Sequence, residues 1–266
     1  MVKNPATANN LLSVIVPVFS QEKTIRQDLT KINEALAATR FDYEIIVVID
    51  GKNKDNSFAQ AKKLKLSRLK VVGYSKNQGK GYAVRYGMAR SSGDKIAFID
   101  AGMDIDPNGI SMILEHMEWY QADIIVGSKR HLASRVDYPL TRKIMSLVYH
   151  RLVWLLFGFR VSDTQAGLKV FRRQVLKKVL PRMLVKKFAF DVELLAIAKF
   201  LGFNRIYEAP IKLNRKRFEF SSTVAWNTAF EMVWNTLAVF YRLKILHYYD
   251  NRNWRAWPKD QKLKIN

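Results

Sequence analysis

The 266-residue sequence predicts an α/β fold with a mostly parallel central sheet flanked by helices. Two observations lead to this fold class. Short apolar runs alternate with amphipathic stretches in the first half of the chain, which is the pattern of β-α-β units. The composition, 48% hydrophobic and 26% charged, is that of a globular protein and excludes a disordered, collagen-like or coiled-coil chain.

The first half contains the elements of the expected sheet. Strands are expected at 11–19, 43–50, 69–75, 95–100 and 122–128. Apolar residues recur every three or four positions from Ile25 to Leu36, which predicts a helix over about 22–39. Further helices are expected at 80–91 and 107–120, and Pro107 suits the first turn of the latter because its missing N–H would have no partner there.

Beyond residue 127 the pattern changes to helices with a short pair of strands. Helices are expected at 140–157, 172–180, 190–201 and 222–244, and strands at 167–171 and 204–214. The tail from Asp250 is mostly polar, with Trp254 and Trp257 as its largest apolar groups. We expect this tail to fray or to lie across the surface.

Positive charge is concentrated in the second half. The formal net charge is +22; residues 1–128 hold 17 basic and 14 acidic side chains, whereas residues 129–266 hold 28 basic and 9 acidic ones. Such asymmetry indicates an anionic partner, which could be nucleic acid, a membrane surface or a phosphorylated substrate. Charge alone does not choose among these partners.

Several classes of protein are excluded by what the chain lacks. It has no cysteine, so disulfides and thiolate metal sites are excluded. The four histidines lack the paired spacing of metal ligands. The first residues are polar and do not resemble a signal peptide. The longest apolar run, 152–159, is far shorter than the roughly 18 to 20 residues that cross a bilayer. We therefore expect no signal peptide and no transmembrane helix.

Acidic residues stand at or just beyond the ends of three of the predicted strands: Glu22 after the first, Asp50 at the second, and Asp100 and Asp104 at the fourth. Strand ends are where ligands bind in open α/β sheets. Carboxylates there can bind a ribose or base, or hold Mg²⁺ or Mn²⁺ against a diphosphate. The alternative is that these Asp-Gly segments are only turns. The run Asn77-Gln78-Gly79-Lys80-Gly81 precedes a predicted helix, and its glycines would let the backbone approach a phosphate.

The order of these segments carries a resemblance. The segments are Pro17-Val18-Phe19-Ser20-Gln21-Glu22, Val48-Ile49-Asp50-Gly51, Asn77-Gln78-Gly79-Lys80-Gly81, Gly93-Asp94 and Phe98-Ile99-Asp100-Ala101. Together they closely resemble glycosyltransferase family 2, which has the GT-A fold. Asp163-Thr164-Gln165-Ala166-Gly167-Leu168-Lys169 and Phe190-Asp191-Val192-Glu193 are similar to the dolichyl-phosphate glucosyltransferase and mannosyltransferase branch, the glucosyl type more than the mannosyl. The resemblance covers residues 11–223.

The resemblance implies a donor site for a nucleotide-diphosphate sugar, with UDP-glucose favoured. The residues that would bind the nucleotide-sugar are Pro17, Phe19, Glu22, Asp50, Lys80, Asp100 and Ser222. The family usually has Asp-x-Asp at its metal site, but here Gly102 stands at the second Asp. Asp100 and Asp104 would then hold Mg²⁺ or Mn²⁺ together. The altered Ser20-Gln21 and Ile49 are further departures from the family pattern.

The resemblance also implies an acceptor site for a polyprenyl or dolichyl phosphate. Lys129, Arg142 and Ser146 would bind the acceptor phosphate, and Arg142 and Ser146 share one helix face because they are four residues apart. A late motif that closes over the donor diphosphate is kept only as Arg217 and Ser222.

An inverting mechanism follows from these assignments. A phosphomonoester has a second pKa near 6, so the acceptor oxygen is already an anion at neutral pH and needs no general base. Asp100 with its cation and Arg217 would neutralise the departing diphosphate, and Asp163 would orient a sugar hydroxyl or, for a hydroxyl acceptor, act as base. In-line attack inverts the anomeric carbon.

The domain and location expectations follow. We expect a flexible N-terminus at 1–10, a GT-A domain at 11–223 and an amphipathic helix with a basic tail at 224–266. Apolar side chains with nearby Lys and Arg, around 147–157 and 226–241, predict either a peripheral contact with an anionic membrane surface or helix faces that belong to the core. A cytoplasmic location on a membrane face is expected, directly or through a separate membrane protein.

Other functions stay open at this stage. The acceptor could be a hydroxyl of a glycan or glycolipid. Gly102 and Ser20-Gln21 also fit a catalytically degenerate protein that only binds a nucleotide-sugar. Nucleic acid is not expected as a partner, because it leaves the acidic strand ends unexplained.

Overall fold

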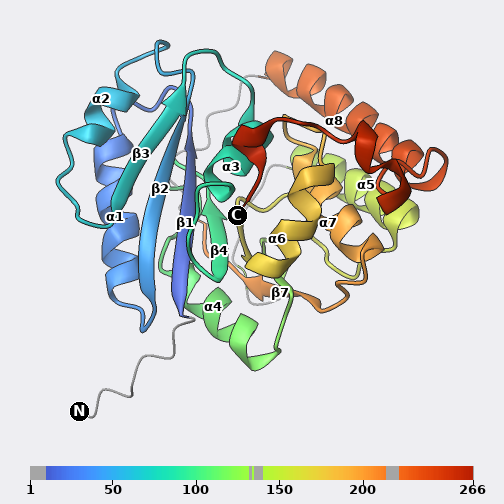
Figure 1. The fold of residues 1–266 in the computed structure, drawn as a ribbon, viewed down its shortest axis with the longest axis horizontal. Coiled ribbons are helices and arrows are strands. Elements are labelled where there is room, and N and C mark those ends of the chain that lie inside the picture. The colour runs from blue at the N-terminus through green and yellow to red at the C-terminus, as the bar shows by residue number, and fades with distance from the viewer. Residues whose placement is uncertain (1–9, 132–133, 135–139, 214–221, 266) are drawn as a thin grey trace.

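A computed structural model describes residues 10–131, 134, 140–213 and 222–265. For residues 140–144 and 222–228 the backbone alone is described. The chain folds into a central sheet with helices on both faces (Figure 1).

The sheet that the described residues form has seven strands in the order β3-β2-β1-β4-β6-β5-β7. Their bounds are β1 Leu11–Val18, β2 Asp42–Asp50, β3 Leu69–Tyr74, β4 Lys95–Ile99, β5 Ile124–Ser128, β6 Leu168–Arg172 and β7 Ile206–Pro210. All neighbours are parallel except that β6 runs antiparallel to β4 and β5. The mostly parallel sheet is thus confirmed, and each predicted strand of the first half is present.

One feature of the predicted topology was wrong. The strands expected at 167–171 and 204–214 do not pair with each other, because β5 lies between β6 and β7. Both strands extend the same sheet. Pairing between strands distant in sequence is set by the tertiary fold and leaves no local signal in the sequence.

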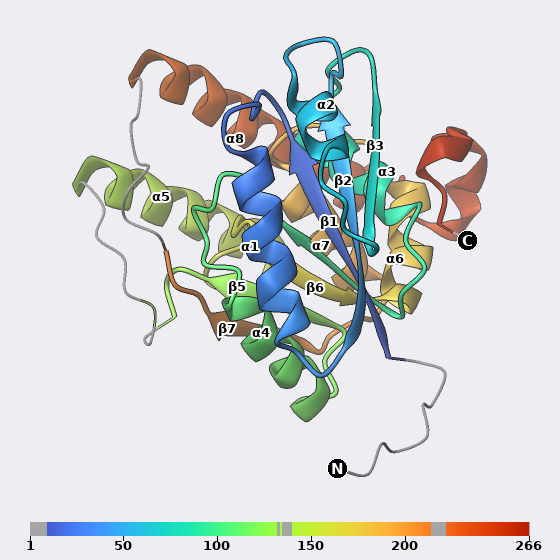
Figure 2. The same ribbon diagram turned by 90° about the vertical axis from the view of Figure 1, so that its left-hand side faces the viewer.

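The helices cover both faces of this sheet. Their bounds are α1 Ile25–Ala37, α2 Ser57–Lys62, α3 Lys80–Met88, α4 Gly109–Trp119, α5 Leu140–Phe157, α6 Arg173–Val179, α7 Phe190–Phe200 and α8 Ser222–Lys244, with short 3-10 turns at Leu180–Arg182, Asn251–Ala256 and Gln261–Leu263. Figure 2 shows α1 and α4 in front of the sheet, with α3 and α6 on the far side. The helix α2 was not predicted, and Pro107 precedes α4 instead of lying in its first turn.

The predicted periodicity of α1 is confirmed by its burial. Ile25, Leu29, Ile32 and Leu36 are fully buried against the sheet, and they share one face because they are three or four residues apart. Polar residues on the other face meet solvent, so the helix forms where one stripe of its surface can be removed from water.

The C-terminal tail does not fray within the described residues. Tyr249 is fully buried and Leu263 is nearly so. The tail crosses the surface from the end of α8 to α3 (Figure 1). Of the two expectations, that the tail frays or that it lies across the surface, the second is confirmed, and a few apolar anchors hold the tail in place.

None of the described helices is both long and apolar enough to cross a membrane.

Gly87 in α3 provides a test of this packing. A Cβ at Gly87 would lie 2.4 Å from Ile15 Cγ2 and 2.9 Å from Val48 Cγ2. Gly87→Ala should therefore lower the free energy of unfolding by about 1–3 kcal/mol through overpacking. Gly109→Ala is the matched control, since nothing lies within 4 Å of its added Cβ, and it should be neutral or stabilising. Urea denaturation of both variants measures the difference, and equal stabilities would contradict the packing.

Candidate functional site

The carboxyl ends of the parallel strands meet at one edge of the sheet. The loops after β1, β2, β3, β4, β5 and β7 lie at this edge, and so does the loop before β6 because β6 runs in the opposite direction. This is the edge at which open α/β sheets bind ligands. Of the described site residues, Phe19, Glu22, Asp50, Lys80, Asp100, Asp104 and Lys129 lie at the end of a strand, in the loop after it or at the start of a helix there, whereas Asp163 precedes β6 and Ser146 lies within α5.

Asp50 holds the glycine-rich segment in place. Its Oδ1 accepts a hydrogen bond from the Gln78 amide at 2.7 Å and its Oδ2 from the Gly79 amide at 2.9 Å. The side chain is only 4% exposed. Both oxygens therefore already bind the backbone, and the predicted contact with a ribose or base would have to use their remaining lone pairs.

The glycines of this segment have a packing role. A Cβ at Gly79 would lie 2.8 Å from the Lys186 carbonyl oxygen, and one at Gly81 would lie 2.6 Å from Phe190 Cβ. Gly79 also has a φ of +97°, where L side chains are strained. The structure shows that these glycines make room for the chain at 186–190. The approach of a phosphate, which the sequence suggested, stays a prediction.

The loops after β1 and β2 are tied together by acidic side chains. Glu22 accepts a hydrogen bond from the Asn56 amide at 3.0 Å, and Asp55 accepts one from the Glu22 amide at 3.1 Å. Phe19, just beyond β1, is exposed, and Pro17 is half-buried within the strand. Phe19 is thus free to meet a ligand, while Glu22 also shapes the loop.

Lys80 and Asp100 form an ion pair at the centre of the edge. Lys80 Nζ lies 2.7 Å from Asp100 Oδ2. Burial lowers the pKa of Lys80, but the charges of Asp100, Asp191 and Asp104 and the hydrogen bond to Asp100 together outweigh this effect and raise the net pKa, so the ammonium stays protonated. A Cβ at Gly167 would lie 2.0 Å from Asp100 Oδ2, so position 167 must be glycine for the carboxylate to occupy this place.

The predicted divalent-cation site would rest on two carboxylates, Asp100 and Asp104. Gly102 contributes no carboxylate; its φ is +95° and its amide donates to Asp28 Oδ2 at 3.2 Å. Lys80 already binds one oxygen of Asp100, and Asp104 is exposed. No group of three or more His, Asp or Glu residues suited to a metal occurs in the described part of the chain. Binding of Mg²⁺ or Mn²⁺ by Asp100 and Asp104 stays a prediction.

A second ion pair, fully buried, supports the first. Lys169 Nζ lies 2.6 Å from Asp191 Oδ1 and also donates to the Ala166 carbonyl at 2.6 Å. Burial raises the pKa of Asp191 and lowers the pKa of Lys169. The pair anchors the loop that ends at Gly167, under Asp100. The sequence motifs contained both residues, but no local signal indicated that they pair.

Asp163 connects this loop to the end of β5. Its Oδ2 accepts from the Lys129 amide at 3.1 Å, and Lys129 Nζ is 3.9 Å from the same oxygen. Glu208 of β7 accepts from the amides of Ser162 and Asp163 at 2.5 and 3.0 Å. The Asp163 carboxylate is thus held by a backbone amide and lies next to the Lys129 ammonium. This setting suits an anion that accepts hydrogen bonds.

Arg130 is the basic residue that sequence reasoning missed. Its Nη2 donates to Ser146 Oγ at 2.7 Å, which joins the β5 loop to α5. His150 lies one turn further on α5, and its pKa is lowered by burial and by the charge of Arg130. The sequence assigned Lys129 and Ser146 to the acceptor phosphate, whereas the structure brings Ser146 to Arg130 and Lys129 to Asp163. Adjacent basic residues in a loop give no signal as to which one faces a helix.

The structure does not describe the side chains of three predicted site residues. Arg217 lies outside the described residues, and Ser222 and Arg142 lie in α8 and α5 where the backbone alone is described. Their assigned roles stay predictions.

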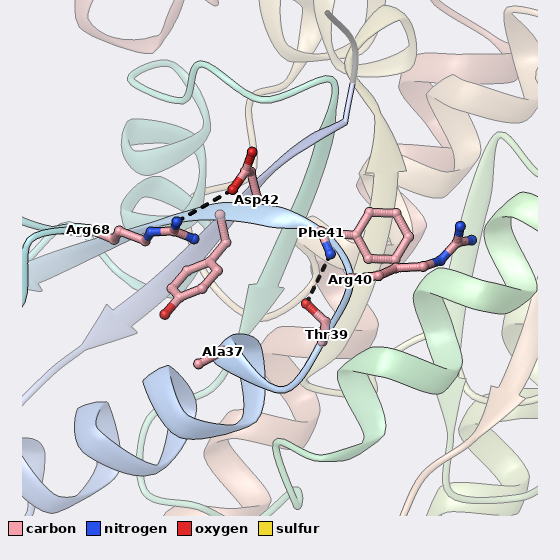
Figure 3. Close-up of a pocket in the computed structure, with 7 residues that line it drawn as sticks. Ala37, Thr39, Arg40, Phe41, Asp42 and Arg68 are labelled. Carbon is pink, nitrogen blue, oxygen red and sulfur yellow. Dashed lines mark hydrogen bonds and ion pairs between the residues drawn. The ribbon is translucent and has the colours of Figure 1, made fainter. Parts of the chain in front are cut away.

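A surface pocket lies at the opposite edge of the sheet, where β2 begins (Figure 3). Arg68 pairs there with Asp42, and the Phe41 amide donates to Thr39. Arg40 points away toward Glu115 of α4, with which it pairs at 2.8 Å. Because both arginines are paired with carboxylates, this pocket offers no free charge for an anion.

The buried ion pair gives a prediction about stability. Lys169→Met should lower the free energy of unfolding by about 3–5 kcal/mol because Asp191 is left buried without its partner. The double variant Lys169→Met with Asp191→Leu should recover much of this loss. Arg68→Met, which breaks the exposed pair with Asp42, is the control and should cost less than about 1 kcal/mol. Urea denaturation measures all three, and similar losses in both single variants would contradict the assignment.

Comparisons with known proteins identify the family of the chain. Residues 13–180 match the family model for glycosyl transferase family 2. The human dolichyl-phosphate beta-glucosyltransferase is 32% identical over 273 residues, covering 96% of this chain and 80% of the relative. A Methanococcus voltae UDP-N-acetylglucosamine--dolichyl-phosphate N-acetylglucosaminyltransferase is 25% identical, covering 77% of this chain and 86% of the relative.

The fold has solved counterparts. Glucosyl-3-phosphoglycerate synthase from Mycobacterium tuberculosis, crystallised with Mn²⁺, UDP and phosphoglyceric acid, superimposes with a TM-score of 0.68 at 20% identity, covering 88% of this chain and 79% of that chain. From the family match and the shared architecture, the chain belongs to glycosyltransferase family 2 and has the GT-A fold.

Proposed function

We propose that this protein transfers glucose from UDP-glucose to a polyprenyl or dolichyl phosphate at a membrane surface, with inversion at the anomeric carbon. The observation that carries the proposal is the position of Arg130 against Ser146 of α5, beside the Asp163 loop. An arginine guanidinium and a hydroxyl are groups that bind a phosphate. The names of relatives, dolichyl-phosphate beta-glucosyltransferases, support this choice of donor sugar and acceptor.

In the proposed reaction, the main task of the protein is to position charged groups around the two substrates. A lipid phosphate is mostly a dianion at neutral pH, so its oxygen attacks the anomeric carbon without a general base. The bond from that carbon to the UDP oxygen breaks, and UDP leaves with the electron pair. Arg130 would reduce the repulsion between acceptor and donor anions, and the Lys80 ammonium would face the diphosphate.

Asp163 has a positioning role in this scheme. Backbone amides of Lys129 and Gln165 donate to its two oxygens at 3.1 and 3.3 Å, so the carboxylate is fixed as an acceptor. Such an acceptor suits a sugar hydroxyl of the donor. If the acceptor substrate were instead a glycan hydroxyl, Asp163 would be the base.

The membrane would be met by the outer faces of α5 and α8. These helices lie side by side and project from one end of the molecule (Figures 1 and 2). Their large exposed apolar side chains are Leu147, Val148, Trp154 and Leu155 of α5 and Phe230, Trp234, Leu237 and Tyr241 of α8. In α8 the spacing of three or four residues places these side chains on one face, while Val239 and Leu243 of the same helix pack into the core.

Ser146 belongs to the same helix as four of these apolar residues, so α5 would join the acceptor site to the bilayer. Arg151 and Lys244 are exposed on α5 and α8 and would attract anionic headgroups. A cytoplasmic, peripheral location is part of this proposal.

Nucleotide release tests the proposed reaction. Purified protein is given UDP-glucose, other UDP-sugars and GDP-mannose, with and without a short polyprenyl phosphate, in Mg²⁺, Mn²⁺ or a chelator. We expect UDP release from UDP-glucose that requires the lipid phosphate. Release that requires a glycan instead would indicate a hydroxyl acceptor, and binding of a donor without any release would indicate a protein that only binds nucleotide-sugars.

Variants assign the two halves of the site. Asp100→Asn should abolish turnover. Arg130→Ala should raise the KM for the lipid phosphate about tenfold or more, the worth of a hydrogen bond to a charged group, with the KM for UDP-glucose unchanged. Arg40→Ala, at the opposite edge of the sheet, is the matched control. Full activity of Asp100→Asn, or an unchanged acceptor KM in Arg130→Ala, would contradict these assignments.

Vesicle sedimentation tests the membrane surface. Phe230 and Trp234 of α8 are 73% and 65% exposed, and Trp119 of α4 is 83% exposed. The protein should bind vesicles of equal parts phosphatidylcholine and phosphatidylglycerol. Phe230→Ser with Trp234→Ser should weaken binding about tenfold or more, as expected for the loss of two buried aromatic groups. Trp119→Ser should bind like the wild type, and equal effects of the two changes would contradict the assigned face.

A further inference from the structure

The segment that follows α8, residues 247–265, runs back across the molecule to α3 (Figure 1). We call it the C-terminal strap. Tyr249 anchors its beginning and Leu263 its end, both buried. Between these anchors, the Arg182 guanidinium donates to the Tyr249 carbonyl at 3.0 Å and lies 4.0 Å from the centre of the Trp257 ring. The strap is thus held by specific contacts along its length.

The strap meets a buried carboxylate of α7. Glu193 is fully buried, and its Oε1 accepts a hydrogen bond from the Tyr249 hydroxyl at 2.8 Å. The same carboxylate accepts from the backbone amides of Leu184 at 3.0 Å and Val185 at 2.8 Å. Arg242 of α8 is 3.4 Å away. Burial and the charge of Glu193 raise the pKa of Tyr249, so its hydroxyl keeps the proton that it donates. One carboxylate therefore joins the strap to the chain at 184–185.

The chain just beyond these amides touches the donor side of the site. The Lys186 carbonyl accepts a hydrogen bond from the Tyr82 amide at 3.0 Å. Gly79 packs against Lys186 and Gly81 against Phe190, so closely that neither position has room for a Cβ. Lys80, which pairs with Asp100, stands between these two glycines. A displacement of the 184–186 backbone would therefore act directly on the residues that flank Lys80.

The far end of the strap binds the helix that Lys80 begins. The Tyr82 hydroxyl donates to Asp260 at 3.2 Å, and Arg90 donates to the Lys262 carbonyl at 2.9 Å. Both side chains come from α3 or the turn that follows it. The strap thus contacts α3 directly and the loop that packs on the start of α3 indirectly.

We propose that Tyr249, acting through Glu193, is a positioning residue for the donor site: it fixes the 184–186 backbone, and this backbone fixes the glycine-rich turn that presents Lys80. The inference rests on the proposed function, in which Lys80 faces the donor diphosphate. The Tyr249 hydroxyl is one of the donors that fix the position of the Glu193 carboxylate, so without it the carboxylate can shift, and the 184–185 amides that it binds shift with it.

Tyr249→Phe tests the proposal because it removes the hydroxyl and keeps the buried ring. We expect the Kd for UDP and the KM for UDP-glucose to rise roughly three- to tenfold, part of the worth of one hydrogen bond to a charged group. The KM for the lipid phosphate should not change. Tyr248→Phe is the matched control, since the Tyr248 hydroxyl donates to the Ala256 carbonyl at 2.9 Å, within the strap.

Amide hydrogen exchange gives a readout that needs no ligand. In Tyr249→Phe the amides of Leu184, Val185 and Tyr82 should exchange faster than in the wild type, and in Tyr248→Phe they should not. If the Tyr82 amide is unaffected in Tyr249→Phe, the coupling is refuted, whatever the kinetics. Equal increases in the KM for donor and acceptor would also refute it, because a general loss of stability has no preference for one site.

The same experiment separates failure of this proposal from failure of the proposed function. If the wild type binds no UDP, the proposed function fails, and the exchange of the Tyr82 amide still decides whether the strap controls the glycine-rich turn. If the wild type binds UDP and Tyr249→Phe binds it equally well, the strap proposal fails and the proposed function stands.

Discussion

Hydrogen bonds from backbone amides to buried or half-buried carboxylates fix the loops on which this site depends. Asp50 holds the glycine-rich turn, Asp28 holds Gly102, Glu208 holds the start of the 162–167 loop, and Glu193 holds the 184–185 chain. Charged acceptors make stronger hydrogen bonds than neutral ones, and an amide that is buried without a partner is costly. A protein with a net charge of +22 thus uses several of its few acidic groups to order loops at the sheet edge.

These hydrogen bonds limit which acidic residues are available to a ligand at the proposed donor site. The carboxylates of Asp50 and Glu22 accept hydrogen bonds from backbone amides. Lys80 and Asp100 instead pair with each other at the centre of the edge. Gly167 leaves space for the Asp100 carboxylate, and the buried pair of Lys169 and Asp191 holds the loop to which Gly167 belongs. The chemistry of the edge therefore depends on packing beneath it.

The proposed acceptor site depends on a single helix. α5 carries Ser146 toward Arg130 and exposes large apolar side chains elsewhere on its surface. In the proposed function, the phosphate site and the membrane-facing surface both belong to α5. The head group of the lipid would therefore reach the site while the lipid chain stays in the bilayer. α8 extends the same apolar surface and, through Arg242 and the strap, is connected to the donor side as well.

The sequence by itself determined the parallel β-α-β half, the family and most of the segments at the site, because apolar periodicity and short motifs are local properties of a chain. The burial of α1 from Ile25 to Leu36 follows from its spacing alone. Tertiary structure decided which charges meet. Arg130 and not Lys129 contacts Ser146, Lys169 pairs with Asp191, and a polar tail becomes an ordered strap through Tyr249. These three contacts join residues 16 to 56 positions apart, and the sequence carries no signal for such pairs because they form only when the folded chain brings the two residues together.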